Sequence, residues 1–259
     1  MVTAIIQARL TSTRLPAKVI NLVNGKEILL HVADRVSNAR LIDNIIVATT
    51  DDANGDVIRN MCDEHNILVY QGSENDVLNR YFQCAKKYNL KDIVRVTADC
   101  PLIDSNIIDR VTDFYLNRNY DYVTNSMEYT YPDGYDVEIF SFESLRISEI
   151  EAILPSEREH VTLYIRKNSK FKKFNIKSDK IYSMKRCSVD YPEDLIFITK
   201  IFEALGSDCN IDEVSDFVAK NPSLLNINQH IPINDGMIKS LRDDTKFLNN
   251  HESEQGNLE

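Results

Sequence analysis

The sequence predicts an α/β protein in which a mainly parallel sheet lies between helices. Short runs rich in β-branched residues alternate with longer stretches whose apolar residues recur at helical spacing, a pattern typical of successive β-α units. The four strands predicted in the first half are residues 2–6, 45–47, 67–69 and 93–96. The chain has 259 residues, 43% of them hydrophobic, which is enough for one large domain with a substantial core.

The stretches between these strands predict helices at residues 27–38, 55–65, 75–88 and 105–117. The first half of the chain therefore contains four β-α units. Parallel strands joined in this way end at the same edge of the sheet, and ligands bind beyond that edge. We expect the functional site among the residues that follow the strands.

The pattern changes after about residue 120. Three strands and one helix are predicted there, at residues 120–125, 135–140, 171–176 and, for the helix, 157–167. We interpret residues 126–185 as an inserted α+β lobe, and residues 1–125 and 186–248 as the core of a single domain.

Three more helices are predicted in the C-terminal part. One begins at Pro192, because proline and the two acidic residues after it favour the first turn of a helix. The other two lie near residues 211–220 and 235–244. Residues 249–259 are polar and acidic with almost no apolar side chain, so we expect a disordered tail.

The charge of the chain restricts its partners. With 30 basic and 40 acidic residues the net charge is -10, which argues against a nucleic-acid or anionic-membrane surface. An anionic ligand must then be bound by a local cluster of cations. The five cysteines are odd in number and widely spaced, and no signal peptide or membrane span is apparent, so we expect reduced thiols and a cytoplasmic location.

The loop after the first predicted strand is the first candidate site. Its backbone amides and hydroxyls can cap a polyphosphate, while Arg9 and Lys18 neutralise the charge that grows as pyrophosphate leaves. The alternative is a solvated turn with surface cations. No glycine-rich phosphate motif occurs in the chain, so phosphates must rely on this loop. Its polar residues are Arg9, Thr11, Ser12, Thr13, Arg14 and Lys18.

A second candidate is Asp99, which follows the fourth strand in the run Thr97-Ala98-Asp99. At the carboxyl end of a strand a carboxylate faces the ligand site, and hard oxygen ligands suit Mg²⁺ with its triphosphate. For Asp104, five residues later, a helix N-cap is the simpler interpretation.

The segment IIQARLTSTRLPAKV closely resembles the N-terminal signature of cytidylyltransferases that make activated sugar acids, such as those acting on 3-deoxy-manno-octulosonate and sialic acids. A shorter branch, the spore-coat polysaccharide biosynthesis proteins, is more similar still. The resemblance extends from this loop to Gln229-His230. It implies a Rossmann-like nucleotide-diphospho-sugar transferase fold, with a mixed and mainly parallel sheet, and a homodimer formed through the inserted lobe.

The resemblance also implies a metal site. The aspartate that matches Asp99 binds the catalytic metal in this family, and Asp190, in the run Ser188-Val189-Asp190, matches the second ligand. Two carboxylates beside a phosphate would repel it without a cation, so we expect dependence on Mg²⁺.

The nucleotide is expected to contact the loop and the ends of the second, third and fourth strands. For Thr50, Asp51, Ser73 and Asp76 a role as helix N-caps is an equally good interpretation, because these residue types are preferred caps. The residues assigned to nucleotide binding are Ala8, Arg9, Leu10, Thr11, Ser12, Thr13, Arg14, Lys18, Thr50, Asp51, Ser73, Asp76, Thr97 and Ala98.

The inserted lobe carries two segments that match the acceptor side of the shorter branch. Arg158, His160 and Arg186 would pair with an anionic acceptor. Asp136 and Glu138 would accept hydrogen bonds from its hydroxyl groups. The alternative is a lobe stabilised by surface ion pairs.

These features together predict transfer of CMP from CTP to an anionic acceptor, a sugar acid or a small phosphorylated polyol or acid, for surface polysaccharide precursors. Arg9, Lys18, Asp99 and Asp190 are the predicted catalytic residues. An acceptor hydroxyl would need a base, which the sequence does not identify. A metal-dependent glycosyltransferase and a non-catalytic nucleotide-binding protein are the alternatives; the first usually needs an Asp-x-Asp element, and the second would not need the cationic loop.

Overall fold

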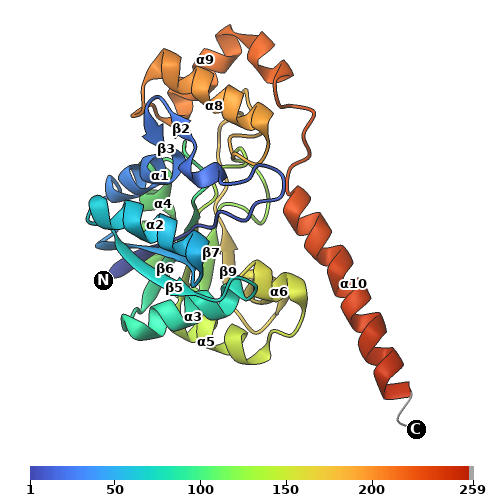
Figure 1. Ribbon diagram of the computed structural model, residues 1–259. Helices are drawn as coiled ribbons and strands as arrows, with labels where there is room; N and C mark the ends of the chain where they lie inside the picture. The colour runs from blue at the N-terminus through green and yellow to red at the C-terminus, as the bar shows by residue number, and fades with distance from the viewer. Residues whose placement is uncertain (257–259) are drawn as a thin grey trace.

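A seven-stranded sheet forms the centre of the molecule in the computed structural model, which describes the backbone of residues 1–256 and the side chains of residues 1–250 (Figure 1). The strand order is β5-β4-β1-β6-β8-β7-β9. In chain order the strands are β1 (Val2–Gln7), β4 (Asn44–Thr50), β5 (Leu68–Gly72), β6 (Asp92–Thr97), β7 (Tyr122–Thr124), β8 (Glu138–Ser141) and β9 (Lys173–Asn175).

The four predicted parallel strands are confirmed. β1 lies between β4 and β6 and is parallel to both, and β5 is parallel to β4. β8 is antiparallel to both of its neighbours, β6 and β7. The carboxyl ends of β1, β4, β5 and β6 therefore lie at one edge of the sheet.

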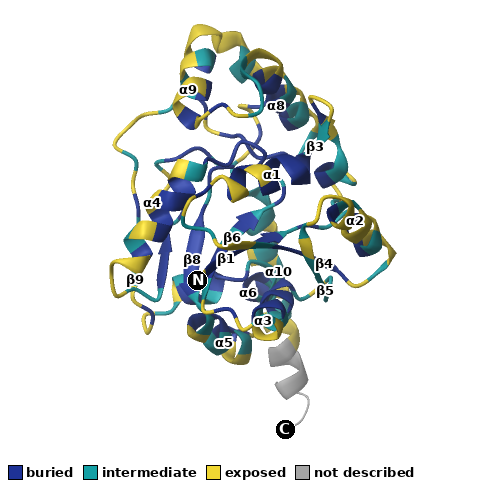
Figure 2. Cartoon of the chain, turned by 90° about the vertical axis from the view of Figure 1, so that its left-hand side faces the viewer, coloured by how far each residue is buried: buried dark blue, intermediate teal, exposed yellow. Residues whose placement is uncertain are grey.

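Helices cover both faces of this sheet (Figure 2). Alternate strand residues point to opposite faces and belong to two different cores. Ile6 of β1 belongs to the core that includes residues of α1 and α4, whereas Ile5 packs with Tyr81 of α3 and Leu145 of α5. The predicted helices of the four β-α units are confirmed as α1 (Ile28–Ser37), α2 (Ala53–Glu64), α3 (Val77–Lys87) and α4 (Ser105–Leu116).

The segment predicted as an inserted lobe extends the main sheet through β8 and β9 instead of building a sheet of its own. The helix predicted at 157–167 is two short helices, α6 (Pro155–Glu159) and α7 (Leu163–Lys167), because the chain turns at Val161, where φ is 53°. The sequence pattern did not indicate α5 (Phe142–Glu151), since two of its three buried side chains are serines.

The C-terminal helices are α8 (Pro192–Leu205), α9 (Ile211–Lys220) and α10 (Asp235–Gly256), and α10 projects from the body of the molecule (Figure 1). No proline or glycine interrupts residues 237–255, so α10 continues beyond the predicted end at Asp244. The expected tail, 249–259, falls partly in the last turns of α10, and residues 257–259 lie outside the described part. No helix among the described residues is long and apolar enough to cross a membrane.

The smaller elements are η1 (Lys18–Ile20), the hairpin of β2 (Leu22–Val23) and β3 (Lys26–Glu27), and η2 (Pro222–Asn226). Among these, η1 begins with Lys18, one of the predicted catalytic residues.

Candidate active site

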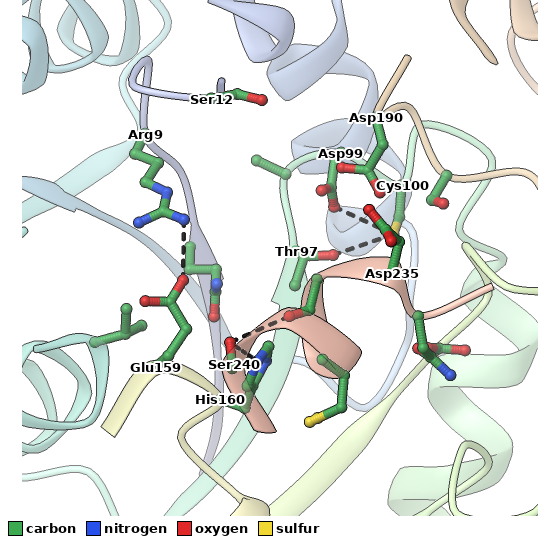
Figure 3. A pocket seen from close by; sticks show the side chains of 18 of the residues that line it. Arg9, Ser12, Thr97, Asp99, Cys100, Glu159, His160, Asp190, Asp235 and Ser240 are labelled. Carbon is green, nitrogen blue, oxygen red and sulfur yellow. Dashed lines mark hydrogen bonds and ion pairs between the residues drawn. The ribbon is translucent and has the colours of Figure 1, made fainter. Parts of the chain in front are cut away.

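A polar cavity of ≈ 680 Å³ lies at the carboxyl edge of β1 and β6. The loop after β1, the end of β6, residues 186–191 and the first turns of α10 form its walls (Figure 3). This is the position at which parallel α/β sheets bind ligands. The cavity therefore lies where the sequence predicted the site.

The cationic loop lines this cavity without using glycine. The amide of Ala17 donates to the carbonyl of Leu10 at 2.9 Å and closes the loop, and Ala17 itself adopts a left-handed conformation with φ of 55°. Leu10 thus shapes the loop but does not line the cavity. The predicted nucleotide-binding residues that do line it are Ala8, Arg9, Thr11, Ser12, Thr13, Arg14, Lys18, Thr97 and Ala98.

Lys18 joins the two carboxylates that the sequence placed together. Its Nζ lies 2.5 Å from Oδ2 of Asp99 and 2.7 Å from Oδ1 of Asp190, and its side chain is 11% exposed. The amide of Val189 donates to the carbonyl of Asp99 at 2.8 Å, which holds the two chain segments side by side. Asp99 and Asp190, which are 91 positions apart in the sequence, thereby share the positive charge of Lys18.

Lys18 and Asp99 both remain charged at neutral pH. Burial lowers the pKa of Lys18, but the negative charges of Asp99 and Asp190 outweigh this and raise it. Burial raises the pKa of Asp99, but the neighbouring ammonium group of Lys18 outweighs this and lowers it. The cluster is therefore an ammonium group between two carboxylates.

The carboxylates Asp99 and Asp190 fit a shared divalent cation, because Lys18 already shows that both oxygens converge on one positive group. Mg²⁺ in nucleotide sites takes one or two carboxylates together with phosphate oxygens. No group of three or more His, Cys, Asp or Glu side chains within the described residues is arranged for a metal ion. A Mg²⁺ ion at this pair would therefore need the phosphates of a nucleotide to complete its ligands.

The two loop arginines also have carboxylate partners. Arg14 lies 2.6 Å from Asp190 and 3.1 Å from Asp235, the first residue of α10. Arg9 lies 2.9 Å from Glu159 at the end of α6 (Figure 3). Each cation of the loop is thus held by a carboxylate from a different part of the chain.

Arg186, predicted to bind the acceptor, lines the cavity but is almost fully buried, and it organises the carboxylates. It lies 2.9 Å from Asp133, 3.0 Å from Asp190 and 2.9 Å from Asp194. An oxygen of Asp194 also accepts hydrogen bonds from the amides of Asp190 and Tyr191, both at 3.0 Å. Arg186 therefore fixes the turn that presents Asp190.

The opposite wall contains two arginines that flank one glutamate. Glu138 of β8 contacts Arg95 of β6 and lies 3.1 Å from Arg166 of α7. It also accepts hydrogen bonds of 2.5 Å from the hydroxyls of Tyr122 and Thr162. Burial raises its pKa, but the two guanidinium groups outweigh this and lower the pKa to about 2. Glu138 is therefore fully ionised and holds the two arginines at the wall.

His160 lines the cavity but carries no positive charge at neutral pH. Its Nε2 lies 2.9 Å from Oγ of Ser240 on α10 (Figure 3). Burial, followed by the charge of Arg95, lowers its pKa to about 4. In the free protein His160 is therefore neutral and can exchange a hydrogen bond with a ligand, and its pairing with an anionic acceptor stays a prediction.

Several predicted residues do not reach the cavity. Arg158 lies 2.5 Å from Asp76 and 2.8 Å from Glu149, so it ties α6 to α3 and α5. Asp76 caps α3 by accepting from the amide of Asn79 at 2.9 Å, and the hydroxyl of Ser73 accepts from the amide of Asp76 at 3.1 Å. The capping role that the sequence left open describes Asp76, whereas Ser73 stabilises the turn before α3.

Thr50 and Asp51 are likewise outside the cavity lining. Thr50 is buried, and its hydroxyl donates to Asp52 at 2.6 Å, while Asp52 caps α2 through the amide of Gly55. Asp51 is exposed.

Other cavity residues were not singled out from the sequence. Arg80 of α3 is buried and donates to the carbonyl of Ser73 at 2.7 Å, next to the strand ends. Arg95 lies between two valines in β6, and an arginine in such an apolar strand indicates a polar or charged neighbour. This signal could have identified Arg95 as a site residue from the sequence. Further cavity residues that were not singled out from the sequence include Tyr129, Asp133, Arg166, Asp235, Lys239 and Ser240.

Comparison with known proteins gives a consistent result. The family model for cytidylyltransferases matches residues 3–221. The chain is 34% identical to the uncharacterized protein MJ1063 of Methanocaldococcus jannaschii, with 88% of this chain and 94% of that protein covered. It is 29% identical to the spore coat polysaccharide biosynthesis protein SpsF of Bacillus subtilis, with 84% and 94% covered.

A solved structure extends this likeness to three dimensions. A cytidylyltransferase from Leptospira borgpetersenii superposes with a TM-score of 0.82 at 33% identity, covering 86% of this chain and 95% of that one. The family model includes β1, β6 and the turn with Asp190, but it ends before α10.

Proposed function

The chain belongs to the cytidylyltransferase family, and from that membership we propose that it transfers CMP from CTP to an anionic small-molecule acceptor and releases pyrophosphate. The observation that carries this proposal is Lys18 between Asp99 and Asp190, beside a loop rich in cations and hydroxyls. This arrangement combines a site for a triphosphate with oxygen ligands for a metal.

The reaction needs charge stabilisation more than covalent chemistry. An acceptor oxygen attacks the α-phosphorus in line with the departing pyrophosphate, and positive groups stabilise the phosphoryl oxygens. Lys18 and Arg9 are placed to do this, with the hydroxyls of the loop and its amides orienting the phosphates. A Mg²⁺ ion held by Asp99 and Asp190 would supply further stabilisation of the phosphate charge.

Arg9 must exchange partners to take part. Its side chain is 40% exposed and is paired with Glu159, so a phosphate can replace this carboxylate at small cost. Lys18 is more deeply buried and already faces the position that a metal-bound phosphate would share. We assign Lys18 to the leaving group and Arg9 to the outer phosphates.

The wall around Glu138 supports an anionic acceptor. Arg95 and Arg166 provide two positive charges against the single charge of Glu138, so this wall keeps a net positive charge at neutral pH. A carboxylate or phosphate group of the acceptor can pair with it. A sugar acid or a small phosphorylated polyol or acid has this chemistry, and the similarity to SpsF supports a precursor of surface polysaccharide. We further propose a cytoplasmic homodimer.

The test is pyrophosphate release from CTP, UTP, ATP or GTP with Mg²⁺ and a panel of sugar acids and phosphorylated polyols, with mass detection of the adduct. We expect release with CTP and one acceptor. A glycosyltransferase would instead consume a nucleotide sugar and release a nucleoside phosphate. CTP binding with no turnover across a broad panel would support a non-catalytic nucleotide-binding protein, and absence of any nucleotide binding would overturn the proposal.

A further inference from the structure

Asp136, in the turn before β8, stands apart from most acidic residues of the cavity. Within the described residues it has no hydrogen bond or ion pair, and its Oδ1 is buried without a partner. Glu74, which also lines the cavity, is likewise without an ion pair among the described residues. Every other acidic side chain that lines the cavity is paired, namely Asp99, Asp133, Glu138, Glu159, Asp190, Asp235 and Asp243.

The surroundings of Asp136 favour the protonated carboxyl. An unpaired buried carboxylate is costly, so the group binds a proton more readily. Burial, followed by the negative charge of Asp133, raises its pKa well above the usual range. Glu138, two residues later, has the opposite environment and a lowered pKa. Such separation of two neighbouring carboxyl groups is a pattern of sites that transfer protons.

The backbone fixes Asp136 relative to Asp190. Gly134 has φ of +98°, and a Cβ atom there would lie 2.6 Å from the backbone of Cys187 and Ser188, so only glycine permits this approach. The amide of Cys187 donates to the carbonyl of Asp133 at 2.7 Å. The turn with Asp136 is therefore packed directly on the segment that presents Asp190.

Charged groups of both signs surround Asp136. Arg166 of α7 and Arg95 of β6 lower its pKa, whereas Asp133 and Glu138 raise it, and Tyr129 lies close enough for its own pKa to be raised by Asp136. Asp136 thus lies near the arginines of the wall and near Asp133, which Arg186 joins to Asp190. A hydroxyl of the acceptor directed at the α-phosphorus would pass this carboxyl group.

We propose that Asp136 accepts the proton of an acceptor hydroxyl as that hydroxyl attacks CTP. This rests on the proposed function and narrows it, because the nucleophile is then a hydroxyl and the anionic group serves for binding. The acceptor oxygen forms a bond to the α-phosphorus, and its proton moves to Asp136 in the ionised form, which the raised pKa makes a stronger base than an ordinary carboxylate. The bond between the α-phosphorus and the bridging oxygen breaks, and pyrophosphate leaves with the electron pair.

The test compares Asp136→Asn with Asp113→Asn, a matched change at an exposed position on α4. With CTP, Mg²⁺ and 3-deoxy-manno-octulosonate, or another hydroxy acid that the wild type uses, Asp136→Asn should lower kcat by about 10²- to 10⁴-fold. The KM for CTP should stay within about twofold because Asp136 contacts the acceptor hydroxyl. In the wild type kcat should rise with pH as Asp136 loses its proton, and this rise should disappear in the variant. Unchanged kcat would overturn the inference.

A second measurement does not need the acceptor. In protein labelled with ¹³C at the aspartate carboxyl, the resonance missing from Asp136→Asn but present in Asp113→Asn should titrate well above the usual value of about 3.9. It should also shift when CTP and Mg²⁺ are added. CTP binding together with ordinary titration would refute only the role of Asp136. Absence of CTP binding would refute the proposed function, and the inference that rests on it.

Discussion

Replacement of Lys18 by methionine removes the cation between two carboxylates while keeping a side chain of similar length. Asp190 retains Arg14 and Arg186, whereas Asp99 loses its only ion-pair partner among the described residues. The side chains of Lys18, Asp99 and Asp190 are 11%, 23% and 16% exposed, so water screens the loss only in part. We expect a measurable loss of folding stability as well as of activity.

The size of the effect follows from this burial. Breaking a fully buried ion pair costs about 3–5 kcal/mol, and the partial exposure of Asp99 to the cavity reduces this to about 2–3 kcal/mol of unfolding free energy. If Lys18 stabilises the departing pyrophosphate, kcat should fall by about 10²- to 10³-fold while CTP affinity changes less. Loss of affinity alone would reassign Lys18 to ground-state binding.

The pH dependence has a definite sign. Because the folded protein lowers the pKa of Asp99, the stabilisation is present above the unfolded value of about 3.9 and is lost as pH falls through the lower folded value. Because the folded protein raises the pKa of Lys18, the stabilisation is present below the unfolded value of about 10.4 and is lost as pH rises through the folded value. The difference between wild type and variant should therefore be constant from about pH 5 to pH 9.

Urea unfolding followed by circular dichroism measures this difference. Lys26→Met is the matched control, because Lys26 forms an exposed pair with Asp34, and such pairs contribute about 0–1 kcal/mol. Equal stability of the Lys18 variant and the wild type throughout this pH range would refute the ion-pair reasoning.

Two further substitutions compare a residue that lines the cavity with one that stabilises the surrounding fold. Asp99→Asn should abolish Mg²⁺-dependent turnover while the circular dichroism spectrum remains that of the wild type; turnover at the wild-type rate would exclude Asp99 as a metal ligand. Arg158→Ala should lower the unfolding free energy by about 1–3 kcal/mol and leave the acceptor KM within a factor of about three, because its partners are Asp76 and Glu149 outside the cavity. A large rise in the KM for the acceptor would show that Arg158 binds the acceptor, as the sequence predicted.

The β-α units could be predicted because their signals are local. Each strand and helix of the first half carries its own periodicity, and β1, α3 and α4 lie within a few residues of the predicted bounds. The helix predicted at 157–167 failed at Val161, where a β-branched residue adopts positive φ and breaks the helix. A pattern of side chains does not contain that backbone constraint.

From residue patterns alone the site was predictable only where its residues cluster in sequence, whereas the pairing of Asp99 with Asp190 came from the family resemblance. Arg9, Arg14 and Lys18 lie in one short loop and all line the cavity. Asp76 was ambiguous because the same carboxylate chemistry caps a helix or binds a ligand, and the cap is what the structure contains. Asp235 reaches Arg14 from the other end of the chain, a contact that tertiary packing alone creates.

The proposed phosphate site of the loop lies in an acidic protein with few glycines. With a net charge of -10, carboxylates are available on every side, and Arg9, Arg14 and Lys18 each have one as a partner. These pairs hold the cations at fixed positions, so a phosphate replaces carboxylates at a preformed site and need not order a mobile loop. In a glycine-rich cradle backbone amides provide this rigidity, whereas here the ion pairs and the left-handed Ala17 provide it. Stability and nucleotide affinity therefore depend on the same side chains, and substitutions of the carboxylate partners should alter both.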